Sequence, residues 1–153
     1  MENIFKAVSR LTAELDDLEV IFPVHLNPVI RELSQKMLAD NKKVHLIEPL
    51  DYLPFANLMA EVDLVLTDSG GIQEEAPSLG KPVLVLRDTT ERPEAVEAGT
   101  VIRVGTEADK IYQQSLKLLT DKKEYSKYAE AVNPYGDGQA VTRIIGALDY
   151  HFD

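Results

Sequence analysis

Short apolar runs alternate with helical segments along nearly the whole chain. The apolar runs cover residues 19–24, 43–47, 63–67, 83–86 and 101–104. Runs that are apolar at consecutive positions are typical of strands buried on both faces, and such strands belong to parallel sheets that helices cover on both sides. The alternation therefore predicts an α/β fold, namely a Rossmann-like doubly wound parallel sheet with right-handed crossovers.

Helices are expected between these runs, where apolar side chains recur every three or four residues. The first carries Ile4, Val8, Leu11 and Leu15 on one face. Others are expected over residues 28–38, 52–62, 70–79, 107–119, 124–132 and 140–148. Asn27 is expected to cap the helix at 28–38, and Gly80 is expected to end the helix at 70–79. No internal repeat or interdomain linker is apparent, so residues 1–153 are expected to form a single domain.

The composition excludes several kinds of partner and site. A formal charge of −10 argues against nucleic acid, because a duplex binder needs a basic face to displace counterions. The absence of cysteine excludes disulfides and thiolate metal sites, and no other metal-ligand spacing occurs. Neither a run of 18 apolar residues nor a signal-peptide pattern is present, so the expected location is the cytoplasm, without a membrane partner.

A glycine pair stands where the third apolar run meets the next helix. The segment reads Asp68-Ser69-Gly70-Gly71 and directly follows the expected strand at 63–67. Glycines let backbone N–H groups approach a phosphate closely, and a helix N-terminus adds unpaired donors and a partial positive charge. The segment therefore predicts an anion site, although the same residues also suit a plain tight turn with Ser69 as the helix N-cap.

Three loops are expected at one edge of the sheet, because parallel strands place their carboxyl ends together. They are the glycine turn, the segment Pro23–Pro28 and the loop from Arg87 to Glu97. Five of the eight residues 87–94 are charged, and Arg87 could supply positive charge that the acidic domain otherwise lacks. In the first loop His25 could bind a ligand or line the rim without a role.

Three further side chains could contact a ligand. Glu75 lies about a turn and a half into the helix after the glycines, where a carboxylate could accept hydrogen bonds from both hydroxyls of a ribose. Arg92 could contact a ligand or form a surface ion pair with Glu91 or Glu94. Phe55 suits a helix core by its spacing, and its ring could also face a nucleobase.

Residues 67–94 resemble the bacterial non-hydrolysing UDP-N-acetylglucosamine 2-epimerases. This segment contains Thr67-Asp68-Ser69-Gly70-Gly71, Gly80-Lys81-Pro82 and Thr89-Thr90-Glu91-Arg92-Pro93-Glu94. Shorter segments at 23–28, 104–106 and 133–138 are similar to the same family, and together the segments span nearly the whole chain. A match of this length and order is far more specific than the glycine turn alone.

The resemblance implies one half of a two-domain GT-B-type architecture, with the active site between two Rossmann-like domains. This chain resembles the C-terminal, UDP-binding domain, and its expected ligand is UDP or UDP-N-acetylglucosamine. Ser69, Gly70 and Gly71 match the family residues that hold the diphosphate, and Glu75 matches the residue that binds the ribose. Phe55 matches a residue of the uracil site, and Arg92 matches a substrate contact. Leu50 stands where some members have glutamine, so any contact there is expected from its backbone, and His25 is a further candidate.

The family reaction interconverts UDP-N-acetylglucosamine and UDP-N-acetylmannosamine by elimination of UDP and its re-addition. In the family the acid–base carboxylates lie in the N-terminal domain, and a His-Arg-Arg motif normally precedes the segment that begins at Met1. Neither is in this sequence, so the resemblance implies a binding domain without catalytic residues of its own, inactive alone and without a cofactor.

Two other functions stay open at the level of sequence. The same architecture serves the nucleotide-binding half of a GT-B glycosyltransferase, and a chain of this kind could also be a stand-alone nucleotide-sugar binding module. Full-length members of the resembling family are homodimers, and their product enters cell-envelope polysaccharide biosynthesis. The sequence therefore implies a partner domain and a dimer only through the resemblance.

Overall fold

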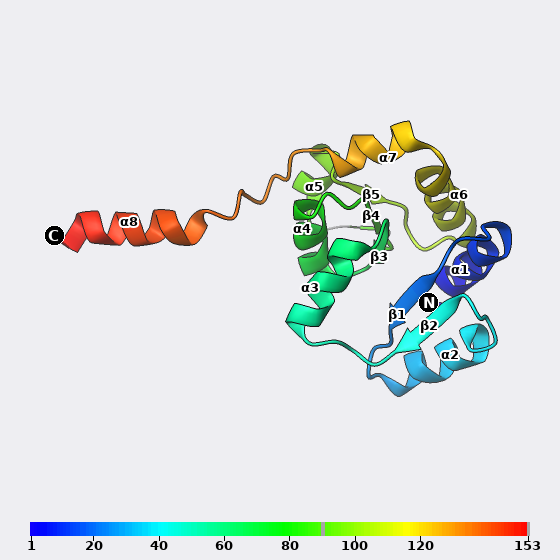
Figure 1. Cartoon of the computed structure of the whole chain (residues 1–153). Coiled ribbons are helices and arrows are strands. Elements are labelled where there is room, and N and C mark those ends of the chain that lie inside the picture. Colours follow the sequence, from blue (N-terminus) through cyan, green and yellow to red (C-terminus); the bar gives the residue numbers. More distant parts are fainter. Residues whose placement is uncertain (90, 153) are drawn as a thin grey trace.

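The computed structural model describes residues 1–89 and 91–152, as parallel strands with helices between them (Figure 1). The strands are β1 (Val20–Pro23), β2 (Val44–Ile47), β3 (Val65–Thr67), β4 (Val83–Val85) and β5 (Val101–Arg103). The helices are α1 (Glu2–Glu14), α2 (Pro28–Leu38), α3 (Tyr52–Glu61), α4 (Gly70–Ser78), α5 (Pro93–Glu97), α6 (Ala108–Thr120), α7 (Lys122–Ala129) and α8 (Ala140–Phe152). All the strands and helices expected from the sequence are confirmed.

One helix was not expected. Helix α5 occupies part of the segment that the sequence indicated as a loop, and Pro93 stands at its first position, where a proline has no lost hydrogen bond. The helix is only one to two turns long, which is too short for a visible apolar period. Thr90, which belongs to the predicted charged loop, lies outside the described residues.

The described strands pair in parallel, in two hydrogen-bonded pieces. Strand β1 pairs with β2, and β3, β4 and β5 form a three-stranded sheet with β4 in the centre. Thr67, the last residue of β3, lies opposite Val85, the last residue of β4. The segments that follow these two strands therefore start side by side at one edge of the sheet, as the sequence predicted.

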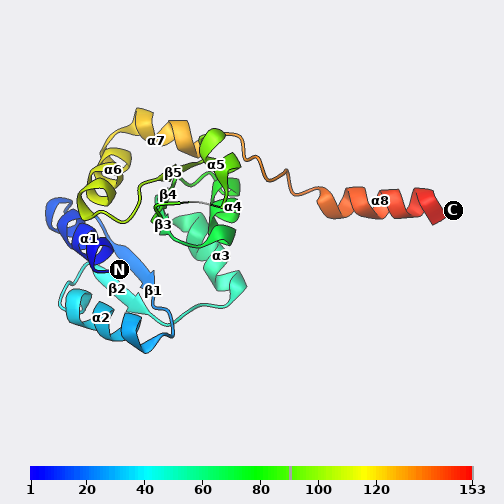
Figure 2. The ribbon, with the colours of Figure 1, turned by 180° about the vertical axis from the view of Figure 1, so that it is seen from behind.

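Strand β4 is buried on both faces. Val83, Leu84 and Val85 are each 0% exposed. Val83 and Val85 pack in one apolar cluster with residues of α3, α4 and α5, whereas Leu84 packs in another with residues of α1 and α6. Figures 1 and 2 show these two groups of helices on opposite sides of the three strands. The doubly wound arrangement predicted from the sequence is thus confirmed.

Helix α1 connects the two pieces of sheet. Ala7 and Leu11 pack in the same cluster as Leu84, on the side of the three-stranded sheet. Phe5 and Val8 pack in a separate cluster with residues of α2 and β2. Because adjacent faces of one helix serve both clusters, the two pieces of sheet share a continuous apolar interior.

The helix starts agree only in part with the predicted caps. Asn27 caps α2 as expected, because its Oδ1 accepts a hydrogen bond of 2.9 Å from the N–H of Val29. Ser69 occupies the N-cap position of α4 but makes no capping hydrogen bond with its side chain. The interpretation of Ser69 as a side-chain cap was therefore wrong, and the first N–H groups of α4 lack that acceptor.

Helix α8 extends away from the other elements (Figures 1 and 2). None of its described residues is buried, and apolar side chains such as Val141, Ile144 and Leu148 are more than half exposed. Over residues 1–89 and 91–152, no helix is both long and apolar enough to cross a membrane. The stability of the folded domain therefore rests on the elements before α8.

Two glycines that end helices allow a matched test of packing at the end of α4. Gly80 and Gly99 have φ values of +68° and +71°, in the left-handed region. A Cβ on Gly80 would lie 3.3 Å from the carbonyl oxygen of Ala129, whereas a Cβ on Gly99 would meet nothing within 4 Å. Only Gly80 is therefore restricted by a neighbour as well as by its backbone.

We expect Gly99→Ala to lower the free energy of unfolding by about 1–2 kcal/mol, the usual cost of a left-handed alanine. Gly80→Ala should lower it by more, because the carbonyl oxygen of Ala129 belongs to the backbone and moves less readily than a side chain. Chemical denaturation of both variants measures the difference. Equal losses would contradict the packing of α4 against the end of α7.

Candidate functional site

Two buried side chains form hydrogen bonds with the backbone of the glycine turn. The hydroxyl oxygen of Thr67 accepts a hydrogen bond of 3.0 Å from the N–H of Ser69. The amide Nε2 of Gln73, which is 0% exposed, donates to the carbonyl of Ser69 at 3.1 Å. The first N–H groups of a helix have no acceptor within the helix, so those of Gly70 and Gly71 are available to a ligand. The backbone of the turn is therefore fixed with donors at its start.

The charged loop after β4 lies against this turn. The position of a Cβ on Gly70 is 3.5 Å from Oε1 of Glu91 and 3.8 Å from Nη2 of Arg92. Nη1 of Arg87 donates to the same carboxylate oxygen of Glu91 at 2.7 Å. The structure thus brings Arg87 and Arg92 to the predicted anion site, at the edge of the sheet where the sequence placed them.

Arg92 is ion-paired with a residue that the sequence did not indicate. Its Nε lies 2.5 Å from Oε1 of Glu74, and its Nη1 donates to the carbonyl of Glu91 at 3.1 Å. The hydrogen bond and charge of Glu74 raise the pKa of Arg92 above its usual value. The alternative of an ion pair for Arg92 named the wrong partners, because the ion pair forms with Glu74 and not with the side chain of Glu91 or Glu94.

Glu75 and Phe55 occupy positions consistent with their expected roles. The side chain of Glu75 is exposed, and its Oε1 lies 3.8 Å from the position of a Cβ on Gly71. In the described part of the chain it has no hydrogen bond or ion pair, so both oxygens can accept from a ligand. Phe55 is partly buried in the apolar cluster that also contains Ile72 of α4. Both expected roles stay predictions.

His25 and Leu50 are less closely connected to the turn. His25 follows β1, in the other piece of sheet, and its Nδ1 accepts a hydrogen bond of 3.1 Å from the N–H of Asn27. The residue as a whole is exposed. Leu50 lies between β2 and α3 with 38% of its side chain exposed. A role for either residue stays a prediction.

A segment near the end of the chain ties α4 to α5, and sequence reasoning missed it. Asn133 donates from Nδ2 to the carbonyl of Glu74 at 3.2 Å and to the hydroxyl of Ser78 at 2.5 Å, while its Oδ1 accepts from the N–H of Tyr135. Tyr135 packs in the same apolar cluster as Ala95 of α5. Turn chemistry was the visible signal in this segment, and the hydrogen bonds of Asn133 to α4 join residues more than 50 positions apart.

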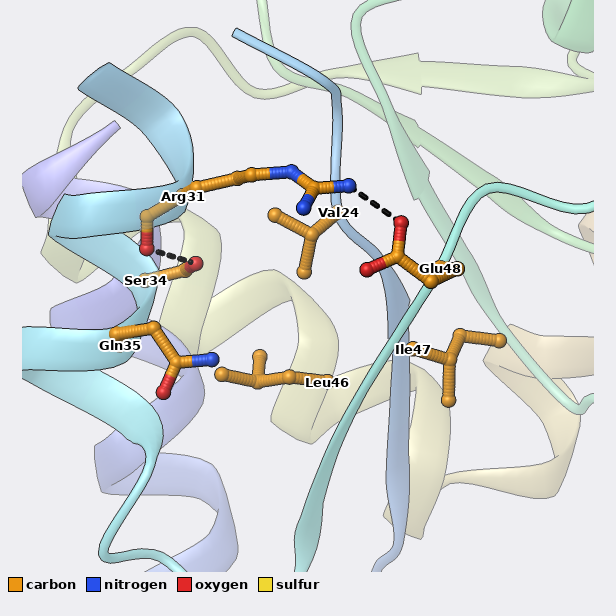
Figure 3. Close-up of a pocket in the computed structure, with 7 residues that line it drawn as sticks. All are labelled: Val24, Arg31, Ser34, Gln35, Leu46, Ile47 and Glu48. Carbon is orange, nitrogen blue, oxygen red and sulfur yellow. Dashed lines mark hydrogen bonds and ion pairs between the residues drawn. The ribbon is translucent and has the colours of Figure 1, made fainter. Parts of the chain in front are cut away.

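A separate hollow of about 190 Å³ lies between α2 and the two-stranded sheet (Figure 3). Its lining consists of Val24, Arg31, Ser34, Gln35, Leu46, Ile47 and Glu48. The guanidinium of Arg31 reaches across it to the carboxylate of Glu48, and the hydroxyl of Ser34 donates to the carbonyl of Arg31. None of the predicted site residues lines this hollow. Over residues 1–89 and 91–152, no cluster of acidic or histidine side chains could hold a metal ion.

The fold and the turn together define a class of protein. A glycine-rich turn between a parallel strand and a helix, with guanidinium groups beside it, is the arrangement by which Rossmann-like domains hold anionic ligands. A family model described as UDP-N-acetylglucosamine 2-epimerase matches residues 1–149. The chain belongs to this family.

Individual relatives agree with the family match. A UDP-N-acetylglucosamine 2-epimerase of Bacillus subtilis (strain 168) is 58% identical over 152 residues, which cover 99% of this chain and 40% of that protein. The S. aureus MnaA–UDP co-structure has a TM-score of 0.92 and 52% identity, covering 98% of this chain and 41% of that one. A Neisseria meningitidis UDP-GlcNAc 2-epimerase bound to UDP-GlcNAc has a TM-score of 0.91 and 49% identity, with the same coverage. The chain spans about 40% of the length of these relatives.

We expect Asn133→Ala to lower the free energy of unfolding by about 1–3 kcal/mol, because it removes two hydrogen bonds to α4, one of them partly buried, each of which contributes about 0.5–1.5 kcal/mol. Asn3→Ala is a matched control, since exposed Asn3 donates one hydrogen bond, to the carbonyl of Thr106. In the same denaturation experiment, Asn3→Ala should lower the free energy of unfolding by much less than Asn133→Ala does. An equal effect of both variants would show that Asn133 does not hold α4.

Proposed function

We propose that this chain is the UDP-binding half of a UDP-N-acetylglucosamine 2-epimerase. The observation that carries the proposal is the glycine turn, whose backbone donors are held in place in a fold that matches a relative bound to UDP-GlcNAc. The family match favours an epimerase over a glycosyltransferase of similar architecture. The relatives' greater length supports a partner domain that completes the enzyme.

The geometry supports a specific division of roles within the site. Ser69, Gly70 and Gly71 bind the diphosphate through the N-terminus of α4. Glu75, one turn further along the same helix, accepts hydrogen bonds from the ribose hydroxyls. Arg92 adds positive charge next to Gly70, which matters because the chain as a whole carries a formal charge of −10.

The remaining candidates surround these residues. Phe55 lies in the apolar cluster beside α4 and offers its ring to the uracil, while Leu50 contributes through its backbone. His25 stands at the end of β1 and completes the rim on that side. The proposal thereby assigns the base to α3, and the ribose and the diphosphate to α4.

The chemistry itself requires groups that we do not assign to this chain. Elimination and re-addition of UDP need a general acid and base at C2 of the sugar, whereas the described site consists of backbone donors, cations and a ribose-binding carboxylate. We therefore propose that the chain binds UDP weakly and is inactive alone, in the setting of a cytoplasmic GT-B-type homodimer that serves cell-envelope polysaccharide biosynthesis.

Calorimetric titration of the 153-residue chain with UDP should reveal binding at one site, weaker than expected for a complete enzyme. Incubation with UDP-GlcNAc, followed by chromatographic separation of UDP-ManNAc, should reveal no turnover. Absence of UDP binding at millimolar ligand would contradict the proposed function. Turnover without a second polypeptide would contradict only the assignment of the chemistry to residues outside this chain.

Replacing Gly70 by alanine should separate ligand binding from folding. The added methyl group meets Glu91 and Arg92 at ordinary contact distances of 3.5 Å or more, and Gly70 lies within a helix. Gly70→Ala should therefore leave the thermal midpoint unchanged or raise it, because alanine favours the helix. The same methyl group hinders the close approach of a phosphate to the backbone of the turn, so the affinity for UDP should fall about tenfold or more, equivalent to about 1.4 kcal/mol.

Gly146→Ala is the matched control for this variant. Gly146 also lies within a helix, and its added methyl group would meet nothing within 4 Å. This variant should bind UDP with the affinity of the unaltered chain. If Gly70→Ala also keeps that affinity, the turn does not bind the diphosphate.

A further inference from the structure

One of the protein's own carboxylates lies at the start of α4. Oε1 of Glu91 is 3.5 Å from the position of a Cβ on Gly70, at the point where the diphosphate is proposed to bind. The same oxygen accepts the hydrogen bond from Nη1 of Arg87. Nη2 of Arg92 lies 3.8 Å from the same position on Gly70. An anionic group and two guanidinium groups are therefore already assembled beside the glycine turn.

The electrostatics of the helix start favour a negative group near it. The first N–H groups of α4 lack acceptors within the helix and carry a partial positive charge. The side chain of Ser69 does not cap them. The carboxylate that the loop after β4 brings beside Gly70 is that of Glu91, which accepts a hydrogen bond from Arg87. A carboxylate in this position resembles two oxygens of a phosphate group in charge and geometry.

The contacts of Glu91 are of a kind that can be exchanged. The side chains of Arg87 and Glu91 are 40% and 58% exposed, so their ion pair is solvated and contributes little to stability. Arg92, in contrast, is anchored on Glu74 and less exposed. The carboxylate of Glu91 can leave the turn without unfolding the loop, whereas the guanidinium of Arg92 stays beside Gly70.

We propose that Glu91 is an internal competitor of the diphosphate and thereby a specificity-determining residue of this site, an inference that rests on the proposed function. The carboxylate lies beside the start of α4 and moves away when a diphosphate binds there, which transfers the guanidinium of Arg87 to the ligand. A ligand must carry enough negative charge to displace the carboxylate. Uridine, without phosphate, has no such competition to overcome at the turn.

The test is a calorimetric comparison of the unaltered chain with Glu91→Gln, using UDP, inorganic pyrophosphate and uridine as ligands. Glutamine keeps the size of the side chain and removes the charge that competes with the ligand. The affinities for UDP and pyrophosphate should rise about fivefold or more, as expected for removal of a nearby like charge. The affinity for uridine should not change.

Glu94→Gln is the matched control, because Glu94 is an exposed carboxylate three residues further along and the substitution changes the net charge equally. It should alter the affinity for UDP by less than about twofold, since exposed charges at a distance are screened by salt. An equal rise with both variants would overturn the inference in favour of a general charge effect. Weaker or unchanged UDP binding by Glu91→Gln would overturn it as well, and weaker binding would make Glu91 a ligand contact.

These outcomes are distinct from a failure of the proposed function. If neither the unaltered chain nor Glu91→Gln binds UDP, the diphosphate site itself is refuted. If the unaltered chain binds UDP and Glu91→Gln binds no more tightly, the site stands and only the competition by Glu91 is refuted.

Discussion

The burial of β4 on both faces is the constraint on which the rest of the structure depends. Its side chains alternate between two apolar clusters, so helices must cover both sides of the sheet. With both faces occupied, only the ends of the strands remain accessible to a ligand. The glycine turn and the charged loop are neighbours because β3 and β4 pair in parallel and end opposite one another. The location of the site is thus a consequence of how the core is packed.

An acidic domain that binds a diphosphate must rely on local positive charge. The structure supplies it from α4 and from two arginines that are already paired with glutamates. Such pairing keeps each guanidinium ordered. It also means that a bound anion replaces a glutamate as the partner of an arginine and does not meet an unpaired arginine. Under the proposed function, the balance between acidic and basic groups near the turn therefore determines which anions the domain selects.

The sequence predicted most of the fold because its strands and helices have clear periods and end signals, such as Asn27 and Gly80. It also predicted that Arg92 approaches the glycine turn. It did not predict the partner of Arg92 or the contacts of Asn133, because these join residues 18 and more than 50 positions apart. Helix α5 was not predicted because it is too short for an apolar period, and the sequence does not reveal that the side chain of Ser69 makes no capping hydrogen bond. Such features follow from tertiary packing and not from local pattern.

The two hydrogen bonds beneath the glycine turn have a thermodynamic consequence. Thr67 and Gln73 order the backbone of the turn when the domain folds, so the entropy of arranging its donors is lost before any ligand is present. Association then costs mainly the freedom of the ligand and of a few exposed side chains. Under the proposed function, the domain is a preordered template, and its response to a nucleotide is confined to the carboxylates and guanidinium groups at its rim.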